Sequence, residues 1–256
     1  MPKHLRPHIA AFRDFARTGD EIADDPELDL DAKLICLDAL DKALTKGETG
    51  EAFVRPALDL RRSLAATGVG DAQARQMIEG FRRDAQTGNY QTWGDLLTHC
   101  RFSAIPVGRH MMALHGESEA PGVAFDALCS ALQILTIVQE CRNDWVVRGR
   151  CYIPLTWFNQ LRVSPERLVE TRCDPRLRAV FDRTLDRVDA LLVRSAPLPQ
   201  LIAHRGLRLQ VSVLLATAQA LTHHLRHRDP LAGAVRLPLP QRLWASLRGL
   251  IMGLRR

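Results

Sequence analysis

Aromatic residues make up only 5% of this chain of 256 residues, and alternating runs of β-branched residues are scarce. Because strands are enriched in both residue types, no segment is predicted to be a strand. The sequence also lacks a Walker loop, a GxSxG motif and a GxGxxG loop after a strand. With 46% apolar and 25% charged residues, the composition is still that of a folded globular protein. These features favour an all-α protein.

Cysteine motifs and membrane-spanning runs are missing as well. The six cysteines show no CxxC pair or other zinc-type spacing, so we expect reduced side chains that pack in the interior. The Met-Pro-Lys-His start is not followed by an apolar segment, and residues 209–225 are too few and too polar to cross a bilayer. The sequence therefore predicts a cytoplasmic protein, either free or peripheral on the inner face of the membrane.

Positive charge is concentrated in the C-terminal part. The chain carries 35 basic and 29 acidic residues, a net charge of +6. Residues 1–150 hold 18 basic and 22 acidic residues, whereas residues 151–256 hold 17 and 7. A basic surface attracts nucleic acids, anionic membranes and phosphorylated ligands alike. Because the basic residues are not interleaved with clustered aromatic residues, we expect no binding of nucleic acid.

Apolar residues recur with the period of a helix along almost the whole chain. Leu34, Leu37, Leu40 and Leu44 form one stripe, and a second stripe lies within residues 177–192. Helix breaks are predicted at Gly and Pro positions, namely 25–26, 47–50, 68–70, 116–122, 154, 164–165, 174–175 and 197–199. The sequence thus predicts one all-α domain over residues 1–256, with about eight helices.

A first polar stripe lies within residues 11–25. Arg13, Arg17, Asp20 and Asp24 are spaced four, three and four residues apart, so they share one face of a helix. An isolated acidic pair at this spacing is usually a solvated surface with local ion pairs. The stripe indicates a site only together with a second one.

The second polar stripe lies on a segment that is otherwise apolar. Gln133, Thr136, Glu140 and Asp144 recur at three, four and four residues, beside the apolar run 132–138. Buried carboxylates are costly unless they are paired or bind a metal ion. The alternatives are therefore an ion pair with an arginine across a helix interface and a metal site.

Two such helices can face each other across a cavity in a helix bundle. Carboxylate oxygens are hard ligands that suit Mg²⁺, and Mg²⁺ is commonly shared with the phosphates of a substrate. Arginines bind phosphate oxygens, and Arg17, Arg148 and Arg150 lie close to the two stripes in the sequence. These residues together predict a magnesium-bridged diphosphate site.

Four segments carry a resemblance to a known family. In order, they are DFARTGDEIADD, TWGDLLTHCRFSAIPVGR, LQILTIVQECRNDWVVRGRCYIP and LRLQVSVLLATAQALTHHLRHRDPLAGAVRL. They resemble the squalene and phytoene synthase family, and within it the bacterial enzymes of hopanoid biosynthesis. The resemblance extends over nearly the whole chain and implies an isoprenoid-synthase-type helix bundle around a central apolar cavity.

The resemblance also implies residue roles and a reaction. Mg²⁺ binding and catalysis fall to Asp20, Asp24, Glu140 and Asp144, and substrate binding to Arg17, Gln133 and Arg150. In the implied reaction, presqualene diphosphate loses its diphosphate, and water captures the rearranged cation to give hydroxysqualene. Two alternatives stay open, namely head-to-head condensation of prenyl diphosphates to squalene or phytoene, and a weakened family member that acts as a binding partner. Other hopanoid-pathway enzymes are candidate partners.

Four positions depart from the family pattern. Arg13 and His99 stand where tyrosines are usual, and Thr136 and Glu140 stand where asparagine and aspartate are usual. Glutamate keeps the charge of aspartate but displaces a ligand of an ion with strict geometry, and threonine lacks the amide carbonyl of asparagine. Because both carboxylate pairs persist, we expect an active enzyme with a modified site.

A cluster of three histidines is a further candidate site. His223, His224 and His227 have a spacing that suits a metal ion, but they lie at a basic helix end, where histidines favour the helix dipole, and we do not expect a metal there.

The final segment, residues 241–256, is predicted to be an amphipathic helix. Its apolar residues lie on one side, with Arg242, Arg248, Arg255 and Arg256 around them. This pattern is typical of a helix that lies in a membrane surface. A terminal helix packed on the core is the alternative.

Overall fold

The computed structural model describes residues 2–86, 88–233 and 235–254. Within them, ten α-helices have ten or more residues, and extended pairing is limited to an isolated bridge between Asn89 and Cys151. The all-α prediction is confirmed. The described residues form two compact units, one of residues 2–86 and 106–116 and one of residues 88–105 and 117–254. The single domain over residues 1–256 stays a prediction.

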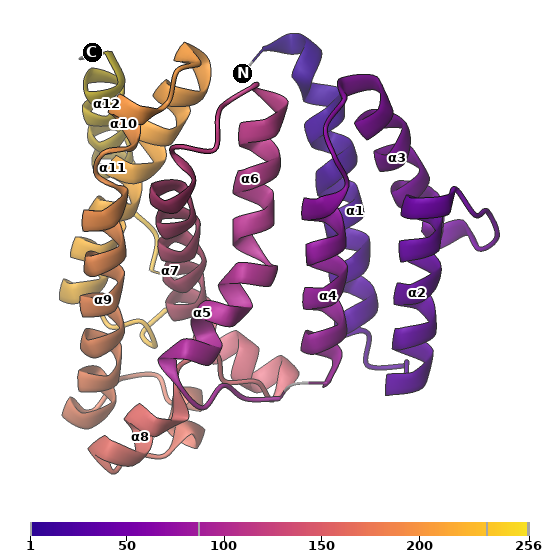
Figure 1. Cartoon of the computed structure of the whole chain (residues 1–256). Coiled ribbons are helices and arrows are strands. Elements are labelled where there is room, and N and C mark those ends of the chain that lie inside the picture. The colour runs from indigo at the N-terminus through magenta and orange to yellow at the C-terminus, as the bar shows by residue number, and fades with distance from the viewer. Residues whose placement is uncertain (1, 87, 234, 255–256) are drawn as a thin grey trace. The chain divides into compact units, whose positions relative to one another are not determined.

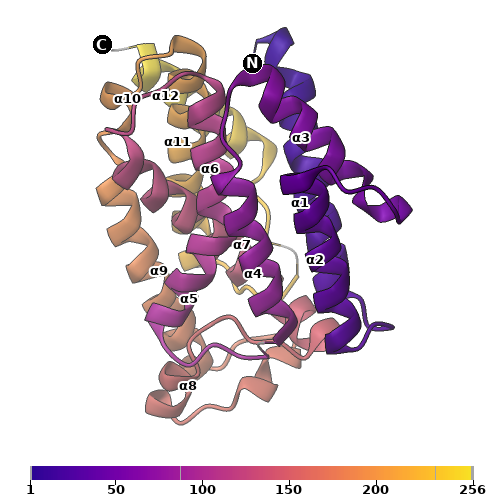
Figure 2. The same ribbon diagram turned by 45° about the vertical axis from the view of Figure 1, so that its right-hand side comes forward.

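The first unit is a helix bundle (Figure 2). It has its own hydrophobic core. It contains η1 (Lys3–Leu5), α1 (Arg6–Asp24), α2 (Leu30–Lys46), η2 (Ala52–Val54), α3 (Arg55–Thr67), α4 (Ala72–Gln86) and most of α6 (Ala104–Leu114). The predicted stripe on α2 faces this core, because Leu37, Leu40 and Leu44 are buried and Leu34 is half-buried. Phe15 of α1 is fully buried in the same core.

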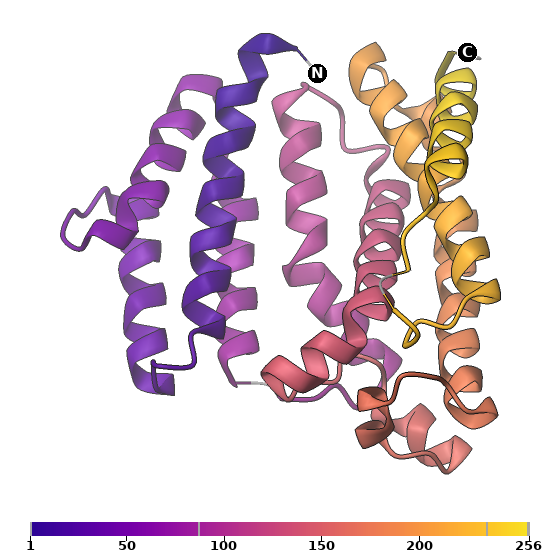
Figure 3. The ribbon, with the colours of Figure 1, turned by 180° about the vertical axis from the view of Figure 1, so that it is seen from behind.

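The second unit is built around one long helix (Figures 1 and 3). It contains α5 (Trp93–Phe102), α7 (Gly122–Arg148), α8 (Leu155–Leu161), η3 (Pro165–Val169), α9 (Pro175–Ser195), α10 (Leu198–Leu201), α11 (Arg205–His227) and α12 (Leu239–Leu254). Helix α7 contacts α5, α9 and α11. The stripe predicted within residues 177–192 faces inward, since Leu177, Phe181 and Leu185 are fully buried.

Helix α7 is the one helix among the described residues that is both long enough and apolar enough to cross a membrane. Its length and hydropathy would suit a membrane span, but 67% of its most apolar 18-residue window is buried within the protein. A core helix is expected to have both properties. The helix ends at Gly149, which adopts the left-handed conformation with φ 62°, and the Arg150 N–H then donates to the Asp144 carbonyl at 3.2 Å. This C-cap changes the direction of the chain directly after the second polar stripe and places Arg150 close to Asp144.

The predicted number of about eight helices is too low. Residues 71–115 contain α4, α5 and α6, although no break was predicted between them. Helix α5 begins with a capping box, in which Thr92 accepts from the Asp95 N–H at 3.2 Å and Asp95 accepts from the Thr92 N–H at 2.8 Å. The Thr-x-x-Asp pattern that makes this cap is present in the sequence and marks the missed boundary.

Candidate active site

The first polar stripe lies on α1, opposite the side that faces the core. Arg13 pairs with Asp14 at 3.0 Å, and Arg17 lies 3.7 Å from the Glu21 carboxylate. Asp20 is exposed and Asp24 is half-buried. The helix packs closely on α4 just before Asp20, because a side chain at Gly19 would overlap the ring of Phe81. The first unit thus holds Asp20 and Asp24 one helical turn apart on a well-anchored helix.

The second polar stripe lies along α7, and its four residues differ in exposure. Gln133 is half-buried, whereas Thr136 and Glu140 are exposed. The Thr136 hydroxyl donates to the Leu132 carbonyl at 3.1 Å. Asp144 is only 5% exposed. The two carboxylates of this stripe therefore differ, since Glu140 faces solvent and Asp144 is enclosed.

Asp144 is held by an arginine of its own helix. The Arg148 guanidinium donates to the Asp144 carboxylate at 2.9 Å. Burial raises the pKa of Asp144 above its ordinary value, the charge of Arg148 opposes this rise, and the Glu140 carboxylate adds to it. Asp144 is thus paired with an arginine, but this arginine lies on α7 itself and not across a helix interface as the alternative had it. A bound metal cation beside the Asp144 carboxylate would favour its charged form further.

Arg150 is positioned by a tyrosine. Its Nη1 donates to the Tyr152 hydroxyl at 3.0 Å, and its guanidinium carbon lies 5.8 Å from the centre of that ring. Arg150 is half-buried, and its charge, like that of Arg148, opposes the rise in the pKa of Asp144. A guanidinium held in this way is pre-organised for a phosphate oxygen.

Both tyrosines of the chain lie in one cluster, which was not predicted. Tyr90 and Tyr152 stack with ring centres 5.1 Å apart, and the Tyr90 hydroxyl lies 3.2 Å from Nδ1 of His99. The two segments are joined by the backbone, since the Tyr90 N–H donates to the Cys151 carbonyl at 3.2 Å and the Leu155 N–H donates to the Tyr90 carbonyl at 3.0 Å. The sequence contains only two tyrosines, and this rarity is the sequence feature that could have drawn attention to the cluster.

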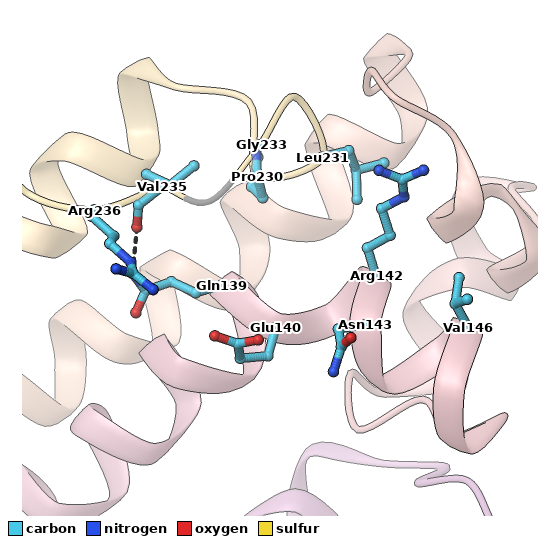
Figure 4. A pocket seen from close by; sticks show the side chains of 10 residues that line it. All are labelled: Gln139, Glu140, Arg142, Asn143, Val146, Pro230, Leu231, Gly233, Val235 and Arg236. Carbon is cyan, nitrogen blue, oxygen red and sulfur yellow. Dashed lines mark hydrogen bonds between the residues drawn. The ribbon is translucent and has the colours of Figure 1, made fainter.

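A pocket of about 360 Å³ adjoins Glu140 (Figure 4). Its lining comes from α7 and from the segment after α11, namely Gln139, Glu140, Arg142, Asn143, Val146, Pro230, Leu231, Gly233, Val235 and Arg236. The Gln139 amide donates to the Val235 carbonyl and ties the two walls together. Figure 4 shows Arg142 extending toward Leu231, on the other side of α7 from Glu140 and Asn143. Two arginines and an acid make this a polar pocket, and the central apolar cavity stays a prediction.

The donor groups fit a divalent ion that is shared with a substrate. Among the described residues, no cluster of three or more His, Cys, Asp or Glu side chains could hold a metal ion. Each polar stripe offers two carboxylates one turn apart, and Mg²⁺ commonly takes one or two protein carboxylates and completes its shell with phosphates and water.

In the histidine cluster, the His223 and His227 rings lie 4.5 Å apart, and burial lowers the pKa of His224.

The chain is similar to proteins of known class over most of its length. The family described as squalene/phytoene synthase matches residues 1–243. Hydroxysqualene synthase of Rhodopseudomonas palustris is 38% identical over 92% of this chain and 80% of that protein, and hydroxysqualene synthase of Sinorhizobium fredii is 34% identical with the same coverage. The crystal structure of squalene synthase HpnC from Alicyclobacillus acidocaldarius covers 89% of this chain and 85% of that chain, with a TM-score of 0.76 and 27% identity.

These similarities confirm the predicted fold type, an isoprenoid-synthase-type helix bundle. Both polar stripes lie inside the matched residues, and the assignment of their side chains to one site stays a prediction. The chain belongs to the squalene/phytoene synthase family.

Proposed function

We propose that this chain converts presqualene diphosphate and water into hydroxysqualene and diphosphate. The observation that carries the proposal is the similarity to two hydroxysqualene synthases, at 38% and 34% identity over 92% of this chain. The carboxylates and arginines of α1 and α7 supply the chemistry that such a reaction needs, because breaking the carbon–oxygen bond places negative charge on the departing diphosphate.

Seven residues are assigned to this site. Metal binding and catalysis are assigned to Asp20, Asp24, Glu140 and Asp144, and substrate binding to Arg17, Gln133 and Arg150. Enzymes that process prenyl diphosphates generally use a divalent metal ion, and we propose Mg²⁺. When bound, it would stabilise the charge that develops on the diphosphate.

The residues at the end of α7 prepare the site before the substrate arrives. Arg148 donates to the enclosed Asp144 and opposes the rise of its pKa on burial, and the Tyr152 hydroxyl accepts from Arg150 and orients it. Charged groups that are already oriented need little reorganisation as the bond breaks, which is the main source of electrostatic catalysis. Asp144 and Arg150 are therefore the residues of this end on which the ionisation step depends most.

The departures from the family pattern are compatible with activity. His99 replaces a usual tyrosine, yet the Tyr90 hydroxyl lies 3.2 Å from its Nδ1 and keeps a phenol at this place. Glu140 replaces a usual aspartate, and its exposed side chain has room to adjust. These two features support an enzyme over a weakened family member that acts as a binding partner.

Incubation of the purified protein with presqualene diphosphate and Mg²⁺ tests the proposal. We expect diphosphate and hydroxysqualene to form, and EDTA to stop the reaction. Farnesyl and geranylgeranyl diphosphate should remain unchanged in parallel reactions, because head-to-head condensation is the competing activity. The absence of metal-dependent diphosphate release from presqualene diphosphate would refute the enzyme assignment. A cytoplasmic location and contacts with other hopanoid-pathway enzymes stay predictions.

A further inference from the structure

The last helix of the described chain buries its smallest residues. Ala245, Gly249 and Gly253 recur every four residues, and they are the buried residues of α12. A Cβ at Gly249 would come within 2.7 Å of the Ser212 carbonyl oxygen, so the backbones of α12 and α11 touch. The Arg208 Nε of α11 also donates to the Gly253 carbonyl at 3.0 Å. These contacts fix which side of α12 faces the protein.

The opposite side of α12 presents large apolar side chains to solvent. Between 41% and 69% of each is exposed, and the set comprises Leu239, Leu243, Trp244, Leu247, Leu250, Ile251 and Leu254. Single exposed apolar residues are normal, but a contiguous apolar surface marks an interaction site. The expected alternative, a terminal helix that packs its apolar side on the core, does not describe this helix. Figure 3 shows α12 lying alongside α11.

Positive charge lies at the N-terminal end of this helix. A pocket of about 610 Å³ lies at the N-terminal end of α12, where Pro238 precedes Leu239. Three arginines line it, together with two histidines and one aspartate, namely Arg172, Arg228, Arg236, His224, His227 and Asp229. Asp229 accepts from the Cys173 N–H at 2.7 Å and the Leu231 N–H at 2.9 Å, so its carboxylate is engaged by the backbone.

The helix itself adds to the positive charge. Residues 239–254 contain no acidic residue, and Arg242 and Arg248 are exposed. The predicted Arg255 and Arg256 lie outside the described residues. The N-terminal end of a helix is also the positive end of its dipole.

We propose that α12 docks onto an anionic lipid bilayer, with its large apolar side chains among the acyl chains and its basic pocket against headgroup phosphates. A helix of this kind lies in the interface and gains affinity from both buried apolar area and anionic lipid. Trp244 has the amphipathic ring that is enriched at this depth. A second copy of the chain is the disfavoured occupant, because its identical arginines would meet those of the first copy.

Flotation with lipid vesicles tests the docking surface. The full chain should float with vesicles of phosphatidylcholine and phosphatidylglycerol, and less with phosphatidylcholine alone. The variant Leu243→Gln, Trp244→Gln, Leu247→Gln should remain unbound. A matched control, Ile35→Gln, Val123→Gln, Val193→Gln, removes three exposed apolar side chains elsewhere, each at least 66% exposed, and should bind as the unchanged chain does. Circular dichroism verifies that both variants are folded.

A charge variant tests the pocket independently. Arg172→Gln and Arg228→Gln should each lower the partition coefficient for the anionic vesicles about fivefold, since one basic residue near such a surface contributes about 1 kcal/mol. The effect should shrink at high ionic strength. Trp244 fluorescence should shift to shorter wavelength on binding, and Trp244→Phe should remove this shift while keeping most of the binding.

Two results would overturn the proposal. One is flotation of the Leu243, Trp244 and Leu247 variant at the level of the unchanged chain. The other is a lipid-free dimer, seen by sedimentation equilibrium, that dissociates in this variant, because the apolar side would then be covered by a second copy. Both readouts are independent of catalytic activity.

Discussion

Helices α7 and α12 are both rich in apolar residues, yet they bury opposite kinds of side chain. Helix α7 buries large residues such as Ile134, Leu135 and Val138 and directs polar residues along one line. Helix α12 buries Ala245, Gly249 and Gly253 and exposes its leucines. The difference teaches that the apolar side of a helix is not always its buried side. A neighbouring helix that approaches closely can instead bury the side with the smallest residues.

The largest expected effect concerns the polar line of α7. Asp144→Asn removes a carboxylate charge from an enclosed site, together with the ion pair that this carboxylate makes with Arg148 at 2.9 Å. We expect the rate of diphosphate release from presqualene diphosphate to fall about a hundredfold or more, as for other losses of preorganised electrostatic groups. Glu166→Gln, an exposed position on η3, is the control and should retain activity. Normal activity of Asp144→Asn would remove the second stripe from the site.

A third helix, α6, differs from α7 and α12 because it buries a histidine, His110. His110 is 1% exposed, stacks on Phe12 with ring centres 3.9 Å apart, and neither ring nitrogen has a hydrogen-bond partner among the described residues. Burial, with a smaller effect of His8, lowers the pKa of His110 from 6.5 to about 4. The unfolded chain therefore binds a proton between these values that the folded chain does not.

The free energy of unfolding should accordingly fall as the pH drops from about 6.5 to about 4, by about 3 kcal/mol from this group. His110→Phe should flatten this part of the stability profile, measured by urea unfolding at a series of pH values. His4→Gln changes an exposed histidine and should leave the profile as it is. An unchanged slope in His110→Phe would assign the acid sensitivity to other groups.

Enlarging the buried side of α12 should break the arrangement on which the comparison rests. Gly249→Ala places a Cβ 2.5 Å from the Val213 Cα, so α12 must shift away from α11. We expect a loss of about 1–3 kcal/mol, seen as a lower midpoint of thermal unfolding. Gly50→Ala is the matched control, because a Cβ there has nothing within 4 Å. An equal midpoint for both variants would contradict the close contact.

The smallest expected effect lies at the cap of α7. Tyr152→Phe removes the hydroxyl that accepts from Arg150 at 3.0 Å. One hydrogen bond to a charged group contributes about 1.5–3 kcal/mol, but Arg150 keeps its charge, so we expect KM for presqualene diphosphate to rise roughly fivefold with a smaller change in kcat. A fall in kcat without a change in KM would assign Tyr152 to the chemical step instead.

Local patterns were sufficient for much of this fold. The stripes of α2 and α9 were predicted because burial follows the helical period. The break at residues 174–175 was also predicted, and Asp174 caps α9 by accepting from the Arg176 and Leu177 N–H groups at 2.8 Å. The two acidic pairs lie on helices as predicted, on α1 and α7. Their joint action in one site stays a prediction.

Contacts between distant segments explain what was missed. The cluster of Tyr90, His99 and Tyr152 depends on backbone pairing between residues that are about 60 positions apart, and no local pattern encodes such a pairing. The different exposure of Glu140 and Asp144 likewise depends on what surrounds α7 at each turn. The orientation of α12 was left open because its apolar pattern is equally compatible with packing inward and outward, and only the glycine spacing hinted at a close backbone contact.

The glycine contact between α11 and α12 also has a consequence for dynamics. Helix α12 buries Ala245, Gly249 and Gly253, whereas α7 buries many large apolar side chains, so we expect less free energy to oppose the local opening of α12 than that of α7. Helix α7, enclosed by α5, α9 and α11, opens only when much of the second unit unfolds. The amide hydrogens of α12 should therefore exchange with deuterium long before those of α7. We therefore expect α12 to separate from α11 in local openings that leave α7 and its neighbours folded.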